Sequence, residues 1–508
     1  MLLYLLFLLI NSGFCLFKFR NDSKYLENFA KDYEKLKNVS TPYGFIAGHP
    51  YMFNKTNKGV EYLGIPFAKA PIGNLRFKEP QPLEKPAWNG TFYANKTANS
   101  CPADIYPTNF TGYSFWNPTN NISEDCLQLN MWVPTKRDPK GACVLVYIYG
   151  GAFFSGSASL DVYNGSILSI KSYCIVIDIN YRLGALGFSY LNDSVIPGNM
   201  GLLDQQLALQ WIHENIHLFG GDNKTITLFG ESAGAFSVVS HLYSNKSHEY
   251  FSRVISNSGT VNNVWGKNSP EYAHNKTIRL AKKLKCVNAT TKNNNTAILE
   301  CLQRANVSDI VSIGAGRAAD EFTYFMPFYF YDEKYNCSYN ESIPNYEDAN
   351  KCNISEAGYE NIIKRVSKEM KFPDDLKNNL STIYEDAYKW RTYQYRSSRF
   401  LSEVYFDCDI FDWVKKIASY VIGPIYYYEF KAVSSANPWP KWMGAMHGYE
   451  LEYEFGLPIR NESLYNPRRI EKEKNLSLYF MGALGGFARI GVPNIYWKPF
   501  NASKPIAC

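Results

Sequence analysis

A serine on a tight turn is the first candidate for chemistry in this chain. Gly230, Ser232 and Gly234 match the pattern G-x-S-x-G, in which a sharp turn from a strand into a helix exposes the serine hydroxyl at the top of a sheet. The apolar run 226–229 is typical of a buried strand, and residues 233–241 are compatible with a helix. The pattern alone is common in ordinary turns, but these flanking segments favour a nucleophile. We therefore predict that Ser232 is a catalytic nucleophile.

A glycine-rich turn is the second candidate. Residues 143–149 form a continuous apolar run, as expected for a strand covered on both faces, and they lead into Gly150, Gly151 and Ala152. Such a turn can aim successive backbone N–H groups at one point, which is how an oxyanion hole is built. An ordinary strand-to-helix turn is the alternative interpretation. The nearby nucleophile pattern favours the oxyanion hole.

The elements that must position these turns alternate between strands and helices. Residues 174–180 form another buried apolar run, and residues 198–219 carry apolar side chains at helical spacing. This alternation predicts an α/β chain with a mostly parallel, doubly wound central sheet flanked by helices. A chain of 508 residues can bury one large core or two smaller ones.

The N-terminus predicts secretion. Residues 2–10 are apolar but too few to span a bilayer, and small residues and Cys15 follow them. We expect a signal peptide over 1–15 and a single mature domain over 16–508. Because the first residues carry no lysine or arginine, an uncleaved anchor or a buried helix is the alternative. No later run is long and apolar enough to predict a transmembrane span, so a secreted, extracellular protein is expected.

Glycosylation sequons and cysteines agree with an oxidising compartment. There are about twenty N-x-S/T sequons, including those at Asn38, Asn89, Asn121, Asn288, Asn336 and Asn475. Eleven cysteines leave ten without Cys15. The expected local disulfides are Cys101 with Cys126, Cys286 with Cys301, and Cys337 with Cys352. Cys143 and Cys174 lie in apolar runs and are expected to be buried free thiols. A net charge of +6 spread along the chain does not indicate nucleic-acid binding.

Several long stretches carry a family resemblance. They include GIPFAKAPIGNLRF, YIYGGAFFSGS, GNMGLLDQQLALQWIHENIHLFGGD, FGESAGA and WPKWMGAMHGYELEYEFGLP. These stretches resemble the type-B carboxylesterase/cholinesterase family of the α/β-hydrolase fold, and most closely its acetylcholinesterase group. The resemblance is dense over residues 64–259 and returns over 424–458. It implies a serine hydrolase that splits choline esters, with acetylcholine as the expected small-molecule substrate, and it implies no metal or organic cofactor.

The resemblance assigns most of the catalytic roles. Ser232 is the implied nucleophile, and the N–H groups of Gly151, Ala152 and Ala233 are the implied oxyanion donors. Ala152 stands where the family usually has glycine. Of seven histidines, only His447 lies in a matching motif, WMGAMHGYE, and it is the implied general base. It follows residues 425–430, which the composition predicts as an apolar strand. A solvent-facing loop histidine is the alternative.

The catalytic acid is where the sequence departs from the family. The best match is Glu321 in the stretch DEFTYF, 89 residues after Ser232 and several dozen fewer than the family usually has. The missing part corresponds to acyl-pocket aromatic residues, part of the gorge rim and the strand that delivers the acid. Residues 309–316 are a candidate substitute for that strand. Either the deletion is tolerated or the sequence lacks core segments.

A site for the choline ammonium is also implied. Trp116 lies between Cys101 and Cys126, where the family places the indole that stacks on the cation. On chemistry alone, an indole in a disulfide-closed loop is more often part of the packed core. The other implied substrate-binding positions are Glu231, Tyr163, Tyr324, Phe325, Trp439 and Tyr449.

The end of the chain leaves one cysteine with two possible roles. Cys408 would pair with a late cysteine in the family, and Cys508 is the candidate partner here. Alternatively, Cys508 links two chains into a homodimer.

Two other functions remain compatible with these residues. A broad-specificity carboxylesterase is favoured if the shortened segment leaves a wide acyl pocket. A catalytically inactive, neuroligin-like adhesion protein would be the other possibility. Such relatives usually lose the serine and carry a membrane span, whereas this chain keeps Ser232 and His447.

Overall fold

A computed structural model describes residues 36–54, 57–103, 105, 108–314, 326–327, 329–344 and 347–501. Several residues with expected roles lie outside this part of the chain: the predicted signal peptide, Glu321, Tyr324, Phe325 and Cys508. Within the described residues, no helix combines the length and apolar character that crossing a bilayer requires.

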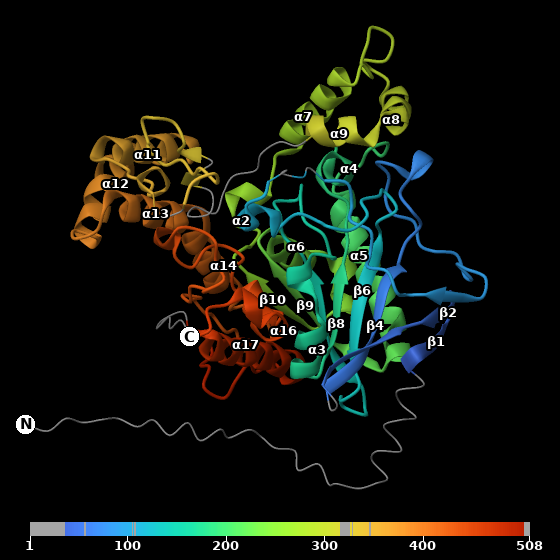
Figure 1. Ribbon diagram of the computed structural model, residues 1–508. Coiled ribbons are helices and arrows are strands. Elements are labelled where there is room, and N and C mark those ends of the chain that lie inside the picture. The colour runs from blue at the N-terminus through green and yellow to red at the C-terminus, as the bar shows by residue number, and fades with distance from the viewer. Residues whose placement is uncertain are drawn as a thin grey trace, which may run out of the picture.

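A seven-stranded mixed sheet forms the centre of the molecule (Figure 1). Its order is β10, β9, β7, β8, β6, β4 and β3. The strands are β3 (His49–Asn54), β4 (Asn57–Pro66), β6 (Gln128–Pro134), β7 (Ala142–Ile148), β8 (Ile175–Ile179), β9 (Gly221–Glu231) and β10 (Arg253–Asn257). Pairing is parallel from β10 to β8 and antiparallel from β8 to β3. The predicted parallel core is confirmed, and antiparallel strands extend it on one side.

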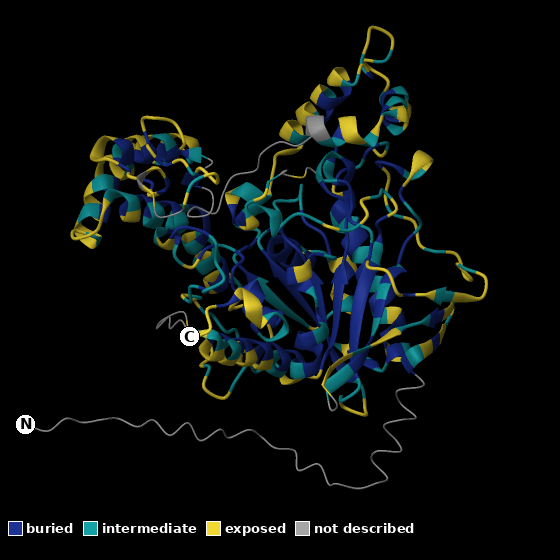
Figure 2. Ribbon diagram, in the orientation of Figure 1, coloured by how far each residue is buried: buried dark blue, intermediate teal, exposed yellow. Residues whose placement is uncertain are grey.

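Burial explains the continuous apolar runs in the sequence. Every residue of β7 and β8 is buried, because helices cover both faces of this part of the sheet (Figure 2). On one face α3 (Ser166–Ser172) and α17 (Ile470–Ile490) pack against each other and against the sheet. On the other face lie α5 (Met200–Asn215) and α6 (Ala233–Leu242). The predicted doubly wound arrangement is therefore confirmed.

Two groups of helices stand away from the sheet (Figure 1). One group is α7 (Pro270–Lys283), α8 (Asn295–Arg304) and α9 (Val307–Gly314). Since residues 309–314 are helical, they do not form the substitute strand that was considered for 309–316. The other group is α11 (Glu356–Glu369), α12 (Asp374–Ala387) and α13 (Tyr393–Ser402), which continues through the π-helical turn η7 (Glu403–Asp407) into α14 (Cys408–Ile417).

Smaller elements complete the fold. A separate three-stranded sheet joins β1 (Asn38–Thr41), β2 (Gly44–Ala47) and β5 (Thr91–Tyr93). The short helices are α2 (Thr111–Ser114), α4 (Gly184–Phe188), α15 (Leu451–Glu454) and α16 (Leu457–Arg460).

Four disulfides link eight of the nine described cysteines. The three expected pairs form: Cys101–Cys126, Cys286–Cys301 and Cys337–Cys352. The expectation of free thiols at Cys143 and Cys174 is wrong, because these two residues form the fourth bond. Val144 pairs in parallel with Ile175, and this register places the Cα atoms of the preceding residues, Cys143 and Cys174, 4.6 Å apart, within the range for a disulfide. Cys408 is free and exposed among the described cysteines.

The outer edge of β10 borders a cavity of about 630 Å³. Within the described residues β10 pairs only with β9, and residues 424–430 face it across this space. The prediction of a strand over 425–430 is wrong, since these residues join no ladder. This cavity therefore lies at the edge of the sheet, next to β10, whose neighbour β9 leads to Ser232.

Candidate active site

The turn at Ser232 is held in a strained conformation by close backbone contacts. Ser232 has φ 57° and ψ −124°, between the end of β9 and the start of α6. Its N–H donates to the carbonyl of Asn257 on β10 at 2.9 Å. A Cβ at Gly234 would lie 1.9 Å from the carbonyl oxygen of Ile148, and one at Gly230 would lie 2.5 Å from Gly234. Only glycine fits at either position, so this turn has the features of a nucleophile elbow.

The glycine-rich turn after β7 lies directly beside the serine. A Cβ at Gly150 would be 2.9 Å from the Cβ of Ser232. Gly151, Ala152 and Phe153 follow with φ of 104°, 52° and 64°. Successive positive φ values are costly for residues other than glycine and are characteristic of functional turns. The turn is thus close enough to present backbone N–H groups to a carbonyl at Ser232. Ala233 is the first residue of α6, where a backbone N–H has no partner within its helix.

His447 reaches the same place from the C-terminal part of the chain. Its Nε2 lies 2.7 Å from Oε1 of Glu231, the residue before the serine. Its ring packs on Phe406 with centroids 5.8 Å apart. Burial of the imidazole lowers the pKa of His447 well below its usual range, so the ring is neutral at pH 7. A neutral imidazole is the form that a general base requires.

Glu231 is a buried carboxyl with an unusual proton affinity. Burial raises its pKa well above the usual range, and the nearby Glu450 and Glu454 raise it further. Burial disfavours charge on both partners of the Glu231–His447 contact, so each group favours its neutral form.

Trp116 lies next to this pair. A Cβ at Gly448, the residue after His447, would lie 3.1 Å from the Trp116 ring and 3.5 Å from Oε1 of Glu231. The half-buried indole also meets the ring of Tyr449 edge-on, with centroids 6.2 Å apart. The Trp116 indole and the Glu231 carboxyl therefore both lie close to Gly448, the residue that follows His447.

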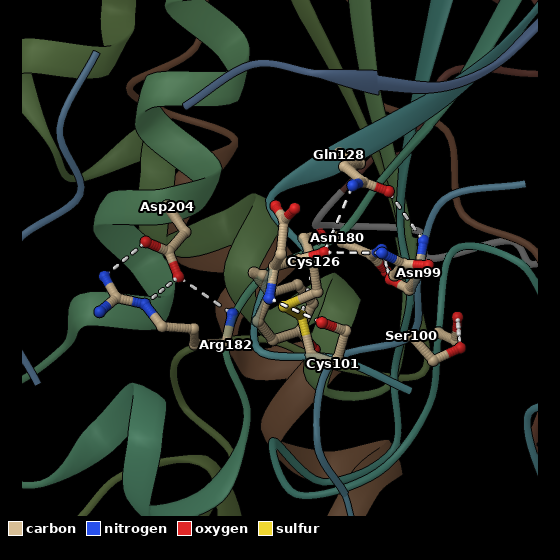
Figure 3. The surroundings of a disulfide bond; sticks show 12 residues. Asn99, Ser100, Cys101, Cys126, Gln128, Asn180, Arg182 and Asp204 are labelled. Atoms are coloured by element: carbon tan, nitrogen blue, oxygen red, sulfur yellow. Dashed lines mark hydrogen bonds and ion pairs between the residues drawn. A yellow bond between two sulfur atoms is a disulfide. The ribbon is translucent and has the colours of Figure 1, made fainter. Parts of the chain in front are cut away.

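The loop that carries Trp116 is anchored at both ends (Figure 3). The Cys101–Cys126 disulfide closes it. Beside the disulfide, the side chain of Asn180 donates to the carbonyl of Asn99 at 2.7 Å. The buried ion pair of Arg182 and Asp204, with atoms 2.7 Å apart, fixes the neighbouring segment. These contacts hold the base of the indole loop against the sheet.

The other predicted binding residues separate into two groups. Trp439 and Tyr449 are hydrogen bonded, Nε1 to hydroxyl at 2.8 Å, and they belong to an aromatic cluster next to Trp116. Tyr163 instead lies in the core, where it is 2% exposed and packs on Tyr147 and Phe455. Burial and the nearby Glu231 carboxyl raise the pKa of Tyr163 well above its usual range. Glu321, Tyr324 and Phe325 lie outside the described residues.

A group of buried carboxyls was missed by the sequence reasoning. Glu450, Glu452 and Glu454 follow His447 at alternate positions, and all three are buried. Asn257 donates to both oxygens of Glu454 at 3.0 Å, and the hydroxyl of Tyr428 donates to it at 3.2 Å. The motif ELEYE, with glutamates alternating with apolar residues in a stretch otherwise typical of a core, was the available signal. Among the described residues, no three acidic, histidine or cysteine side chains gather as a metal site would require.

Comparisons with known proteins show the family of this chain. A profile described as the carboxylesterase family matches residues 35–335 and 315–506. A cholinesterase of Mus musculus is 36% identical over 500 residues, covering 87% of this chain and 78% of that protein. Acetylcholinesterase 4 of Caenorhabditis briggsae is 34% identical over 524 residues, covering 91% and 84%. Acetylcholinesterase of Bungarus fasciatus is 34% identical over 499 residues, covering 87% and 78%.

Proposed function

The chain belongs to the carboxylesterase family and has its α/β-hydrolase fold, and from this premise we propose that it is a serine esterase that hydrolyses choline esters, with acetylcholine as its substrate. The observation that carries the proposal is the meeting of three elements: the strained Ser232 turn, the turn at Gly150–Ala152, and His447 beside Glu231 and Trp116. The names of the relatives, cholinesterase and acetylcholinesterase, support the choice of substrate.

In this mechanism the hydroxyl of Ser232 attacks the ester carbonyl and His447 takes its proton. The N–H groups of Gly151, Ala152 and Ala233 stabilise the oxyanion, each contributing about 3–4 kcal/mol. The C–O bond to choline then breaks, and His447 returns the proton to the departing choline oxygen. Water, activated by the same histidine, releases acetate from the acyl-enzyme.

His447 must change partners for this reaction to begin. Its Nε2 contacts Glu231, whereas proton transfer requires that this nitrogen accept from the serine hydroxyl. Turning away from Glu231 also frees that carboxyl to face the ammonium group. Glu231 therefore has two expected roles, as a resting partner of the base and as part of the cation site.

We propose Glu321 as the acid that orients His447. Its replacement by glutamine is expected to lower kcat on the order of 10³–10⁴-fold, as in other triads that lose the acid. Asp320→Asn is the matched control, because it removes a neighbouring carboxyl from the same stretch. Equal losses in both variants would contradict a specific role for Glu321.

The direct test of the function uses the purified full chain with acetylthiocholine. Hydrolysis by the wild type and its loss in Ser232→Ala are expected. A chain that folds cooperatively but hydrolyses neither thiocholine nor neutral aryl esters would contradict an esterase and favour a binding role.

Trp116→Ala tests the cation site. It is expected to weaken kcat/KM for choline esters by about 2–30-fold relative to neutral esters, which corresponds to the 0.5–2 kcal/mol of a cation–π contact. Trp390→Ala, which removes an indole that is 91% exposed, is the control. Equal effects of Trp116→Ala on both substrate classes would count against the site.

We also propose that the protein is secreted and glycosylated. All six of the named sequon asparagines in the described residues are exposed: Asn38, Asn89, Asn121, Asn288, Asn336 and Asn475. Secretion into the medium of transfected cells, with a mobility shift on enzymatic deglycosylation, is the expected result. Retention in the cell without a shift would contradict it.

A further inference from the structure

The cavity of about 630 Å³ at the outer edge of β10 has apolar walls that also hold two carboxyls. Ile255 on β10, Val414 on α14 and Leu484 on α17 are among its apolar lining residues. Glu450 and Glu454 line it as well, and they are only 5% and 1% exposed. A cavity of this size can hold a small organic molecule, and a few polar groups in an apolar pocket fix the orientation of such a ligand.

The hydrogen bonds of Glu454 come from neutral donors. The side-chain amide of Asn257 donates to both of its oxygens at 3.0 Å, and the hydroxyl of Tyr428 donates to it at 3.2 Å. An ionised carboxylate offers about four acceptor positions. One position on Glu454 therefore remains for a further donor.

The oxygen of the Asn257 side chain also needs a donor. This Oδ1 atom is buried and accepts no hydrogen bond from the described residues. Asn257 is 3% exposed and lines the same cavity. Because an unpaired buried acceptor is costly, a ligand with several N–H groups is favoured here. Such a ligand can donate to Asn257 and to Glu454 together.

The charges around these acceptors favour a cation. Glu450 is close enough to Glu454 to raise its pKa. In the described part of the chain, neither carboxyl forms an ion pair with a lysine or arginine. Arg399 also lines the cavity, but it pairs with Glu403 and Asp407. Since the walls are largely apolar, an organic cation fits better than a metal ion, which needs six or more oxygen ligands or waters.

Aromatic rings form another part of the wall. The ring of Tyr428 packs on Phe480 and on Trp497, with centroids 5.9 and 5.7 Å apart, and all three residues line the cavity. Ring faces attract cations and also pack against hydrocarbon. The wall therefore suits a molecule with a charged end and an apolar body.

We propose that the cavity beside β10 is a second ligand site, which binds a primary amine with a short apolar body. Its ammonium group donates to Glu454 and to Oδ1 of Asn257, and Glu450 supplies a second negative charge. A primary ammonium has three N–H donors, whereas the quaternary group of choline has none. Neither Trp116 nor Glu231 lines this cavity, so the site is distinct from the proposed choline site.

Isothermal titration calorimetry of the full chain at pH 8.5 tests the proposal with n-hexylamine and hexan-1-ol. n-Hexylamine should bind at least about tenfold more tightly than the alcohol, because hydrogen bonds to a charged carboxylate are strong. Equal affinities, or no binding of n-hexylamine, would overturn the proposal. Binding requires no hydrolysis, so this outcome is independent of the proposed esterase function.

Trp116→Ala separates the two sites. The affinity for n-hexylamine should be the same in this variant as in the wild type, and loss of binding would overturn the proposal by placing the amine at the indole. In the same variant, hexyltrimethylammonium should bind at least about tenfold more weakly than n-hexylamine, because it cannot donate hydrogen bonds. Equal affinities for the two cations would overturn the assigned hydrogen bonds.

Glu454→Gln should weaken n-hexylamine binding at least about tenfold and leave hexan-1-ol binding unchanged. Glu452→Gln is the matched control, because Glu452 is also buried but does not line the cavity and accepts from Tyr465. Equal losses in both variants would overturn the proposal. Val414→Phe, which keeps Glu454 and adds a ring to the cavity wall, should weaken both ligands. Unchanged affinities in this variant would overturn the location.

The pH dependence of binding gives a further readout. Burial raises the pKa of Glu450 to about 7, and burial together with Glu450 raises that of Glu454 to about 8. The other titratable groups that face Glu454 are Glu231, Tyr147 and Tyr428, none of which carries positive charge. Affinity for n-hexylamine should therefore rise at least about tenfold from pH 6 to 8.5, as the carboxyls ionise while the amine stays charged. A flat profile would overturn the proposal.

Discussion

The two strands that flank β9 are built very differently. β7 pairs with β8 and β9, and all seven of its residues are buried. β10 pairs only with β9 among the described strands, most of its residues are half-buried, and its outer edge meets the cavity. The parts of the site next to β7, which are the glycine-rich turn and the Ser232 turn, are fixed by close backbone contacts. The parts next to β10, His447 and the buried carboxyls, depend on side-chain packing around open space.

The largest effect is expected at the contact between the serine turn and β7. In Gly234→Ala the new Cβ would lie 1.9 Å from the carbonyl oxygen of Ile148, so the turn or the strand must move. We expect loss of measurable ester hydrolysis and destabilisation by about 3 kcal/mol or more in urea unfolding. Gly482→Ala is the control, because nothing lies within 4 Å of the new Cβ in α17. It should stabilise by about 0.5–1 kcal/mol. A fully active Gly234→Ala variant would contradict the view that backbone contacts with β7 fix the Ser232 turn.

The difference in packing between the two sides of β9 can be measured by replacing one isoleucine on each side with alanine. Ile177 on β8 is fully buried, whereas Ile255 on β10 is half-buried and lines the cavity. Ile177→Ala should cost about 2–5 kcal/mol of unfolding free energy. Ile255→Ala should cost less than about 2 kcal/mol, because part of its surface already faces open space. Equal costs in chemical denaturation would mean that β10 is as tightly packed as the centre.

The buried carboxyls beside β10 predict a pH dependence of stability. Burial raises the pKa of Glu452 to about 7 and raises those of Glu450 and Glu454 as well. The folded state therefore holds protons that the unfolded state releases, and the unfolding free energy should fall as pH rises from about 4.5 to 7 and above. Glu454→Gln should reduce this fall by about 1 kcal/mol or more. Glu300 is exposed, so Glu300→Gln should leave this pH dependence unchanged. The same dependence of the unfolding free energy on pH in both variants would contradict the role given to Glu454.

The smallest effect is expected in native-state hydrogen exchange. Amides of β10 should exchange at least about tenfold faster than those of β7, because local opening is easier where contacts are few. Mass spectrometry of peptides covering 142–148 and 253–257 measures the difference. Similar protection in both peptides would show that the outer edge is covered in solution.

The same contrast explains how much the sequence could predict. The segments around Ser232, β7, β8 and α5 carry continuous apolar runs or helical spacing. These local signals were sufficient to predict their strands and helices. Residues 425–430 carry the same kind of signal, but a strand also needs a neighbour, and β10 does not reach them. The composition of a segment indicates whether it tends to form a strand, but it does not identify the strand with which that segment would pair.

Contacts between segments that are far apart in the sequence could not be predicted from local patterns. The Cys143–Cys174 bond depends on the register of β7 against β8, which no single segment encodes. Phe406, in the π-helical turn between α13 and α14, packs on His447, which lies 41 positions later in the chain. Of the expected site, the structure brings together Ser232, the turn at Gly150–Ala152, His447 and Trp116, while Tyr163 lies in the core.

The order of the four disulfides has a consequence for how this chain matures. Their loops follow one another without overlap: 101–126, 143–174, 286–301 and 337–352. Eight cysteines allow 105 pairings, but here each cysteine finds its partner within the next few dozen residues to emerge. Each bond can close during synthesis before the next cysteines arrive, and short loops close at low entropic cost. Oxidative maturation can thus proceed from the N-terminus onward with little need for thiol reshuffling.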